Sequence, residues 1–586
     1  MENGPGIRPR VVVGLDFGTT FSGFAFAHIT EPEKIYTFYE YPNSTGERPY
    51  CKTLTGIYYK EIGGEWVFKS WGFPARGEYE RDFMALRKLR ARGPSNDPFK
   101  PTVGTCFTKF KLHLAGRDMG PSSASALPEG ITVNVLITDY LREMGALIVH
   151  TLQKNYGPQL TVKSIQWCVT VPSIWSNAAK ATMKMCMAAA GLVDGVHGSP
   201  HPLIMVLEPE AASFHCHKVM SEQTLGIGDK LLVADIGGGT ADIVVQEVVS
   251  VGKNSYRVKE VTTSSGGLCG GTYVDQLFME FMHKKVGPCL QECIFKHPNI
   301  YAHLIKIWES EKVSFGDKSN IGGSIEINLP NKLVAEWENW DQLMGNPARY
   351  SYDDLEISYE EMQSIFDPVI ERNLELISNQ LDQVSTVKVL AVVGGFAGSP
   401  YLMDCIKQRF SSRVPQIISP PNPGSAVCQG AVALALNPGS IDSRVCKKTY
   451  GFHAVEPFEE GIDKPAYRQM YDGVSKCNNR FEVYVRKGDQ VKEDDCFSRL
   501  FMPIFDGQTL IELELYSSEE SNPRYIIGDK VRREGKFVID ISGDMRLQKD
   551  RRLKVSLYFG RSSIEIKAEG LNFSVGSQQF QVPVDA

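Results

Sequence analysis

The chain has 586 residues, of which 42% are hydrophobic and 23% charged, a composition typical of soluble globular proteins. Its 63 Lys and Arg against 69 Asp and Glu give a net charge of −6, so charge provides no reason to expect nucleic-acid binding. No apolar run approaches the roughly 18 residues that span a bilayer, and no signal-peptide pattern precedes residue 11. Membrane, secreted and fibrous classes are therefore excluded, and a cytoplasmic or nuclear location is expected.

Up to about residue 445, short apolar segments alternate with longer amphipathic ones, which predicts an α/β fold. The predicted strands comprise residues 11–17, 164–172, 231–236 and 389–395, and the predicted helices comprise residues 179–192, 275–286 and 366–381. The chain thus begins as a mixed α/β protein.

After residue 446 the hydrophobic pattern has a period of two, as in half-buried antiparallel strands. The strands predicted there are 480–487, 510–516, 536–541, 552–559 and 562–568. A polar, turn-rich segment, 437–451, separates the two patterns. We therefore predict an α/β domain over 11–445 and a C-terminal antiparallel β domain over 446–586.

The thirteen cysteines are scattered and contain no C-x-x-C pair, which fits reduced thiols. Cys289, Cys293 and His297 are four residues apart and would share one helical face. A zinc site is the alternative to ordinary packing there. Packing is favoured, because one helix cannot readily wrap a tetrahedral ion.

An internal repeat lies within the α/β part. Residues 11–29 and 231–248 each contain an apolar strand that ends in Asp, a Gly turn and a second apolar strand, and Asp16 and Gly18 align with Asp235 and Gly237. Two copies of one hairpin predict two related lobes, with one Asp-Gly turn on each wall of a cleft between them.

The composition of the two turns suits phosphate. Glycines remove Cβ atoms where the backbone must approach a ligand, and successive N–H groups in such turns can bind an anion. Asp16 and Asp235 are poor direct neighbours of phosphate but good ones when Mg²⁺ or its bound water lies between. The pattern therefore predicts a site for a nucleotide triphosphate with Mg²⁺.

A third glycine motif, residues 392–400, joins an apolar strand to a helix and contains Gly394 and Gly395. Such a turn lets a flat ring or a phosphate lie against the backbone. The chain has no G-x-x-x-x-G-K-[ST] loop, and no G-x-G-x-x-G between a strand and a helix. The commoner phosphate loops are therefore excluded.

In this order the three motifs resemble the phosphate-1, phosphate-2 and adenosine motifs of the actin, sugar-kinase and heat-shock ATPase superfamily. Within it, residues 11–440 resemble the seventy-kilodalton heat-shock protein family, and the altered residues favour its divergent 12A/12B-like branch. Supporting segments are GLDFGTTFSGFAFA, VLEPEAASFHC and GGLCGGTYVDQLF. The resemblance implies a two-lobed actin-like (ribonuclease H-like) ATPase fold that binds ATP or ADP with Mg²⁺.

The resemblance also implies residue roles. The residues implied to act in catalysis are Asp16, Lys111, Glu208, Asp235 and Thr240. The residues implied to hold the nucleotide are Gly18, Thr19, Thr20, Gly237, Gly238, Gly239, Asp242, Gly270, Gly271, Glu309, Lys312, Gly394 and Gly395. Asp16 and Asp235 are implied to organise Mg²⁺ through water, and Lys111 is favoured over Lys109 as the catalytic lysine.

Several positions depart from the family pattern. The two arginines that stack on adenine are replaced by Val313 and Gly398, an expected Asp is replaced by Gly424, and the Leu-rich linker near 440–450 is missing. The chain also ends soon after the β pattern, so no helical lid over a bound peptide is expected.

Three functions are compatible with these features. The first is a slow ATPase with a chaperone-like or regulatory role, which binds protein clients or signalling partners through the C-terminal β domain. The alternative is a nucleotide-regulated scaffold with little or no hydrolysis. A sugar kinase is disfavoured, because no motif supplies an acceptor pocket with a base.

Overall fold

The computed structural model describes residues 8–42, 50–91, 103–115, 127–194, 198–219, 225–252, 256–297, 299–317, 323–347, 349–471, 473–503, 505–561, 564–573 and 578–581. The fold of this part is mixed α/β with several sheets, as predicted. Its α-helices are α1 (Phe73–Ala91), α2 (Val133–Tyr156), α3 (Asn177–Ala189), α4 (Glu208–Val219), α5 (Gly271–Val286), α6 (Cys289–Lys296), α7 (Asn299–Ser314), α8 (Asn331–Met344), α9 (Tyr359–Leu381), α10 (Pro400–Phe410) and α11 (Ala426–Leu436).

The first sheet contains the first predicted hairpin. Its strands run in the order β3-β2-β1-β8-β9, with β4 paired to β2. Their bounds are β1 (Val11–Asp16), β2 (Phe21–His28), β3 (Tyr36–Thr37), β4 (Thr53–Leu54), β8 (Ile165–Val171) and β9 (Ile204–Leu207). A separate three-stranded sheet comprises β5 (Gly56–Ile62), β6 (Glu65–Trp71) and β7 (Thr105–Thr108). β1 pairs antiparallel with β2 and parallel with β8.

The second sheet repeats this arrangement around the second hairpin. Its order is β17-β16-β10-β11-β12-β18-β22, with β13 paired to β11. The bounds are β10 (Lys230–Ile236), β11 (Ala241–Val251), β12 (Tyr256–Glu260), β13 (Ser265–Gly267), β16 (Val389–Val393), β17 (Gln416–Ile418), β18 (Ile441–Val445) and β22 (Gln490–Lys492). β10 pairs antiparallel with β11 and parallel with β16, just as β1 does with β2 and β8. Strands β14 (Ile325–Asn328) and β15 (Asp354–Ile357) form a small hairpin apart from it.

Helices α4 and α11 connect the two sheets. They pack against each other, and α11 also covers β1, β2 and β8 while α4 covers β10 and β11. A Cβ atom on Gly430 of α11 would lie 1.6 Å from Ala211 O of α4, so only glycine permits this close approach. Most of α11 is buried, which explains its run of small apolar residues.

Apart from β22, which joins the second sheet from beyond the predicted boundary at 446, the described strands after residue 446 form two antiparallel sheets around one core. The first has the order β20-β21-β19-β24-β25 and the second β23-β26-β27-β28. The bounds are β19 (Thr449–Pro457), β20 (Arg468–Tyr471), β21 (Val474–Val485), β23 (Cys496–Phe501), β24 (Leu510–Ser518), β25 (Val531–Asp540), β26 (Leu553–Tyr558), β27 (Glu565–Gly570) and β28 (Gln578–Gln581). Their shared core includes Leu515 and Ile539 from the first sheet and Val555 and Ile566 from the second. The five strands that the period-two hydrophobic pattern predicted correspond to β21, β24, β25, β26 and β27, while β19, β20, β23 and β28 were not predicted.

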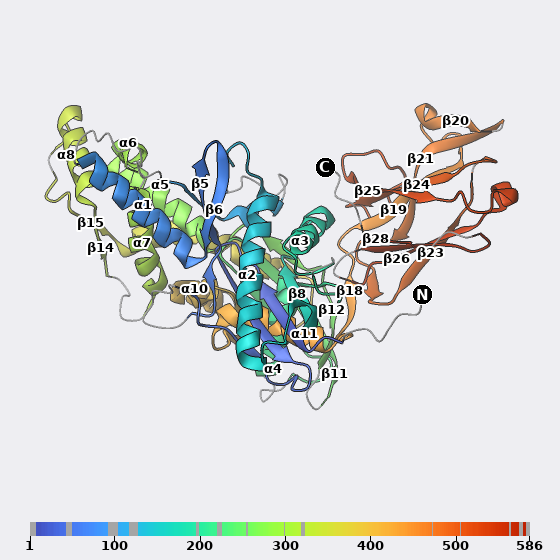
Figure 1. Ribbon diagram of the computed structural model, residues 1–586, viewed down its shortest axis with the longest axis horizontal. Helices are drawn as coiled ribbons and strands as arrows, with labels where there is room; N and C mark the ends of the chain where they lie inside the picture. The colour runs from blue at the N-terminus through green and yellow to red at the C-terminus, as the bar shows by residue number, and fades with distance from the viewer. Residues whose placement is uncertain are drawn as a thin grey trace.

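The segment expected to be a polar join, 437–451, contains a strand. Residues Ile441–Val445 form β18, which pairs parallel with β12 and antiparallel with β22. A turn-rich composition concealed this strand, because the partners that satisfy its backbone are distant in sequence. Figure 1 shows β18 where the helical part meets the C-terminal strands, which are coloured orange to red at one end of the molecule.

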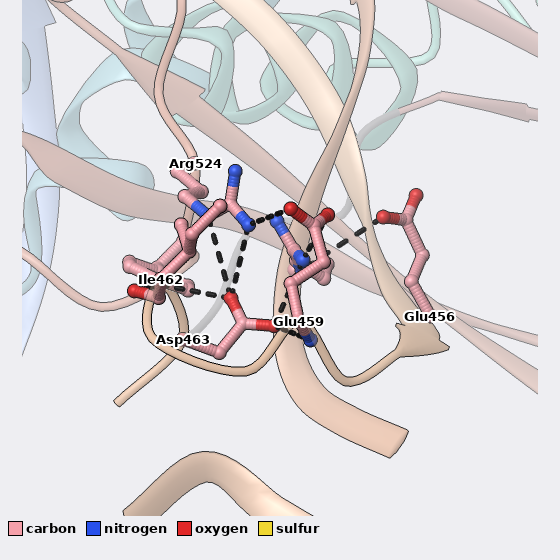
Figure 2. A network of polar contacts seen from close by, with 7 residues as sticks. Glu456, Glu459, Ile462, Asp463 and Arg524 are labelled. Atoms are coloured by element: carbon pink, nitrogen blue, oxygen red, sulfur yellow. Dashed lines mark hydrogen bonds and ion pairs between the residues drawn. The ribbon is translucent and has the colours of Figure 1, made fainter. Parts of the chain in front are cut away.

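An ion-pair network ties the loop after β19 to β21 (Figure 2). The Asp463 carboxylate is fully buried and lies 2.8 Å from Arg480 Nη2 and 3.2 Å from Arg524 Nη2. Tyr525 Oη donates to the same carboxylate at 2.9 Å, and the Glu459 amide donates to it at 2.8 Å. One buried carboxylate thus organises both arginines and the loop.

Candidate functional site

The first predicted phosphate turn, Gly18–Thr20, follows β1. All six residues of β1 are buried, and the strand ends at Asp16. Inside the turn the Gly18 N–H donates to Ser22 Oγ at 3.2 Å. A Cβ atom on Gly18 would lie 2.1 Å from the carbonyl oxygen of Phe21, so the turn requires glycine there.

The second predicted turn, Gly237–Gly239, joins β10 to β11 and lies directly against the first. The Gly237 N–H donates a hydrogen bond of 2.8 Å to the carbonyl oxygen of Thr240, which is buried. A Cβ atom on Gly238 would lie 2.1 Å from Thr20 Oγ1, and one on Gly239 would lie 2.5 Å from Thr19 Oγ1. The structure therefore brings the two turns together, and their glycines allow the contact.

The N-terminus of α5 supports the second turn. The three consecutive amides of Gly270–Thr272 donate to the three carbonyls of Gly237–Gly239, at 2.8 to 3.2 Å. These helix N-terminal N–H groups, which have no partner within the helix, are thereby satisfied. Gly270 and Gly271 consequently position the turn and do not direct these amides at a ligand.

Lys111 and Glu208 form a buried ion pair beside the turns. Lys111 lies in the 3-10 helix Phe110–Ala115, and Glu208 is the first residue of α4. Lys111 Nζ lies 2.7 Å from Glu208 Oε1 and 5.2 Å from the centre of the Trp175 ring. Burial raises the pKa of Glu208 to about 7, although Lys111 opposes this shift.

Lys109, the other lysine of this segment, occupies a different environment. Its backbone is left-handed, with φ of 58°, two residues before Lys111. Burial lowers its pKa, Asp275 opposes that shift and Lys312 adds to it. Lys109 is therefore directed toward the Lys312 region, while Lys111 is the lysine at Glu208.

Asp16, Asp235 and Asp242 complete a buried acidic group. Asp16 Oδ2 lies 2.6 Å from Lys52 Nζ. Asp242 Oδ1 accepts a hydrogen bond from the Ser173 amide at 2.6 Å. Burial raises the pKa of Asp235 well above its ordinary value, and the nearby carboxylates of Glu208, Asp16 and Asp242 raise it further. Asp235 thus lies among three other carboxylates in a buried site.

The third motif follows β16, next to β10. Gly394 has φ of +92°, and its N–H donates to the carbonyl of Pro423 at 3.2 Å. A Cβ atom on Gly394 would lie 2.5 Å from Asp235 Oδ1. Gly394 therefore lies against the acidic group, and Gly395 follows it in the same turn.

Glu309 and Lys312, two of the residues implied to hold the nucleotide, lie on α7. Lys312 Nζ lies 2.6 Å from Asp275 Oδ1 and donates to Gly271 O at 3.4 Å. Glu309 Oε2 lies 3.4 Å from Arg76 Nη1. Val313, at one adenine-stacking position, is 65% exposed. Lys312 thus connects α7 to the second turn through the start of α5.

Two neighbours of the turns were missed by sequence analysis. Lys52 and Tyr50 lie just before β4, in a segment without a glycine motif or a recognisable spacing. No local signal identifies them, because the pairing of β4 with β2 brings them to the first turn. Only the tertiary structure places Lys52 on Asp16.

The resemblance implies Mg²⁺, and the side chains present fit a divalent cation. The four carboxylates of Asp16, Glu208, Asp235 and Asp242 outnumber the ammonium groups of Lys52, Lys111 and Lys447 that interact with them, and after burial the other three carboxylates are what raises the pKa of Asp235. Among the described residues no group of three or more His, Cys, Asp or Glu is placed to hold a metal by itself. Mg²⁺ characteristically keeps several waters and uses substrate phosphates as ligands, so an all-protein cage is not required.

The cysteines of α6 belong to the core. Cys289 and Cys293 are buried among apolar side chains, and Cys289 Sγ donates to Val286 O at 3.3 Å. Burial raises the pKa of both thiols. Packing, the favoured interpretation of this cluster, therefore accounts for both residues.

The geometry can be compared with known proteins. Human heat shock 70 kDa protein 12A is 26% identical over 98% of this chain and 91% of its own length, and the mouse protein of that name has the same values. Human heat shock 70 kDa protein 12B is 25% identical over 95% of this chain and 89% of its own length. The resemblance to the heat shock 70 kDa protein 12A/12B branch is confirmed.

The similarity to the heat shock 70 kDa protein 12A/12B branch extends beyond the motifs. It includes the C-terminal strands, where the sequence patterns alone carried only a weak likeness. A family model described as a domain of unknown function (DUF8340) matches residues 226–419, which contain the second turn and the third glycine motif. In the described part of the chain, no helix combines the length and apolarity needed to traverse a membrane.

Proposed function

We propose that this chain binds ATP or ADP with Mg²⁺ between the two glycine turns. The first and second sheets would be the cores of two actin-like lobes over 11–445, and the sheets of 446–586 would bind a protein partner. The observation that carries the proposal is the contact between two turns from repeated hairpins, each beside a buried Asp. Such turns are suited to a polyphosphate.

In this proposal the residues have separable roles. Amides of the two turns and the hydroxyls of Thr19 and Thr20 hold the phosphates. Mg²⁺, with Asp235 and water as its protein-side partners, would supply positive charge for the phosphate oxygens. Lys111 and Glu208 orient the attacking water, and the raised pKa of Glu208 suits it to accept a proton near neutral pH.

The first experiment is calorimetric titration with ATP, ADP and GTP in the presence of Mg²⁺. We expect binding of the wild type and a loss of about 100-fold or more in Gly239→Val, because its Cβ would meet Thr19 and distort both turns. Gly77→Val, in α1 with open space around the added atoms, is the control and should bind normally. If the wild type binds none of the three nucleotides, the proposal is wrong.

Turnover separates a slow ATPase from the alternative, a nucleotide-regulated scaffold. For the ATPase we expect phosphate release to fall by about 100-fold in Lys111→Met, because Lys111 holds the proton acceptor Glu208 in place, and a positioned proton acceptor contributes about 10² to 10⁴ to such rates. Binding measured in parallel should persist. If wild type and Lys111→Met release phosphate at the same background rate while both bind ATP, the scaffold is supported.

A further inference from the structure

Lys52 places a fixed positive charge at the base of the first turn. Its Nζ lies 2.6 Å from Asp16 Oδ2, and 11% of its side chain is exposed. This ion pair places the charge directly on one of the two carboxylates implied to organise the metal ion.

Tyr50, two residues earlier, extends from the first turn to the third glycine motif. Its ring meets that of Phe21 edge-on, with centres 5.9 Å apart. A Cβ atom on Gly424 would lie 3.1 Å from Tyr50 Oη, and one on Gly395 would lie 3.9 Å from it. Glycine at 424, where an Asp was expected, thus leaves room for this phenol, which would otherwise face a carboxylate.

The two side chains offer donors of complementary kinds. An ammonium has three N–H donors, and Asp16 accounts for one contact of Lys52, while a phenol donates a single O–H. Tyr50 is 39% exposed, so a ligand can reach it. Lysine is also an established point-charge partner of phosphate. Lys52 therefore lies beside the first turn, where the proposed function puts a polyphosphate, and Tyr50 lies between Phe21, next to that turn, and the third glycine motif.

We infer that Tyr50 and Lys52 form a built-in phosphate clamp, which makes nucleotide binding by this chain only weakly dependent on Mg²⁺. The inference rests on the proposed function. Lys52 neutralises Asp16, a charge that would otherwise repel the phosphates unless a metal ion screened it. The Lys52 ammonium group thereby supplies part of the positive charge that Mg²⁺ would otherwise supply.

The test is titration of ADP and ATP in two buffers, one with Mg²⁺ and one with EDTA. We expect the wild type to lose less than about tenfold in affinity when EDTA replaces Mg²⁺. Lys52→Met should lose more than about tenfold relative to the wild type in EDTA and clearly less in Mg²⁺. Tyr50→Phe should show a smaller loss of the same kind, since one neutral donor is removed.

Two further variants exclude a folding defect. Lys52→Arg retains a positive charge beside Asp16, so its affinity in EDTA should be close to that of the wild type. Lys60→Met removes a lysine of β5 that pairs with Asp82 of α1 and has no contact with either turn, and it should titrate like the wild type in both buffers. Tryptophan fluorescence monitors folding, because all seven tryptophans precede residue 446.

The outcomes are distinguishable. Loss of wild-type binding by more than about tenfold in EDTA, or identical behaviour of Lys52→Met and wild type in both buffers, would overturn the clamp and leave the proposed function standing. Absence of wild-type binding in both buffers would overturn the proposed function and the clamp with it.

Discussion

Replacement of Arg444 by Met is expected to lower the stability of the contact between β18 and α4 by about 3–5 kcal/mol, the usual cost of removing one partner of a buried ion pair. Arg444 Nε and Nη2 lie 2.6 and 3.1 Å from the two carboxylate oxygens of Glu210, and Glu210 is fully buried. Arg444 also donates to the carbonyl of Gly560 in the C-terminal part. The variant would leave a buried carboxylate without its bidentate partner.

Amide hydrogen exchange of peptides from β18 and α4 measures this effect locally. Arg257→Met is a matched control, since Arg257 pairs with Asp442 on the same strand but is 55% exposed, and it should cost at most about 1 kcal/mol. Glu210→Leu combined with Arg444→Met should recover much of the loss, because apolar replacement of a buried pair is often tolerated. Equal protection from amide exchange in Arg444→Met and Arg257→Met would show that the buried pair contributes no more stability than the exposed pair.

Local sequence signals predicted the elements that depend on local pattern. The buried strands β1, β8, β10 and β16 and the helices α3, α5 and α9 lie where apolar periodicity placed them. The repeated hairpins were also predictable, since each carries its own Asp and Gly. The strand β18 was not, because its polar residues Asp442, Ser443 and Arg444 are stabilised by partners from three distant segments, β12, α4 and β22.

The same limit applies to the candidate site. Glycine turns can be recognised in the sequence, because few other residues tolerate such close backbone contacts. Lys52 and Tyr50 carry no comparable signature, since a lysine or tyrosine before a strand is ordinarily a surface residue. Gly424 gave a partial hint: the loss of an expected carboxylate indicates that something else fills its place, and the structure shows Tyr50 there. Charge compensation is a property of the folded arrangement.

The second large expected effect concerns Asp463 in the C-terminal part. Asp463→Ala should lower the stability of the sheet containing β19 and β21 by about 1–3 kcal/mol, because Arg480, whose side chain is 6% exposed, would lose its fully buried partner and keep only the half-exposed Glu459 and Glu456. Hydrogen exchange of peptides from β19 to β21 is the readout. Asp494→Ala, at a 95% exposed position paired to Arg561 at 3.7 Å, should change protection little.

This network also predicts a direction for the pH dependence. Burial would raise the pKa of Asp463, but the Glu459 amide, Tyr525 and the two arginines outweigh it and hold the pKa below its usual range. The associated stabilisation is therefore complete above the unfolded-state pKa of about 3.9 and disappears as the pH falls through the lower folded-state pKa. Asp463→Asn, which cannot ionise, should lack this acid-sensitive component. If wild type and Asp463→Asn lose protection in parallel on acidification, Asp463 is not the group that links stability to pH.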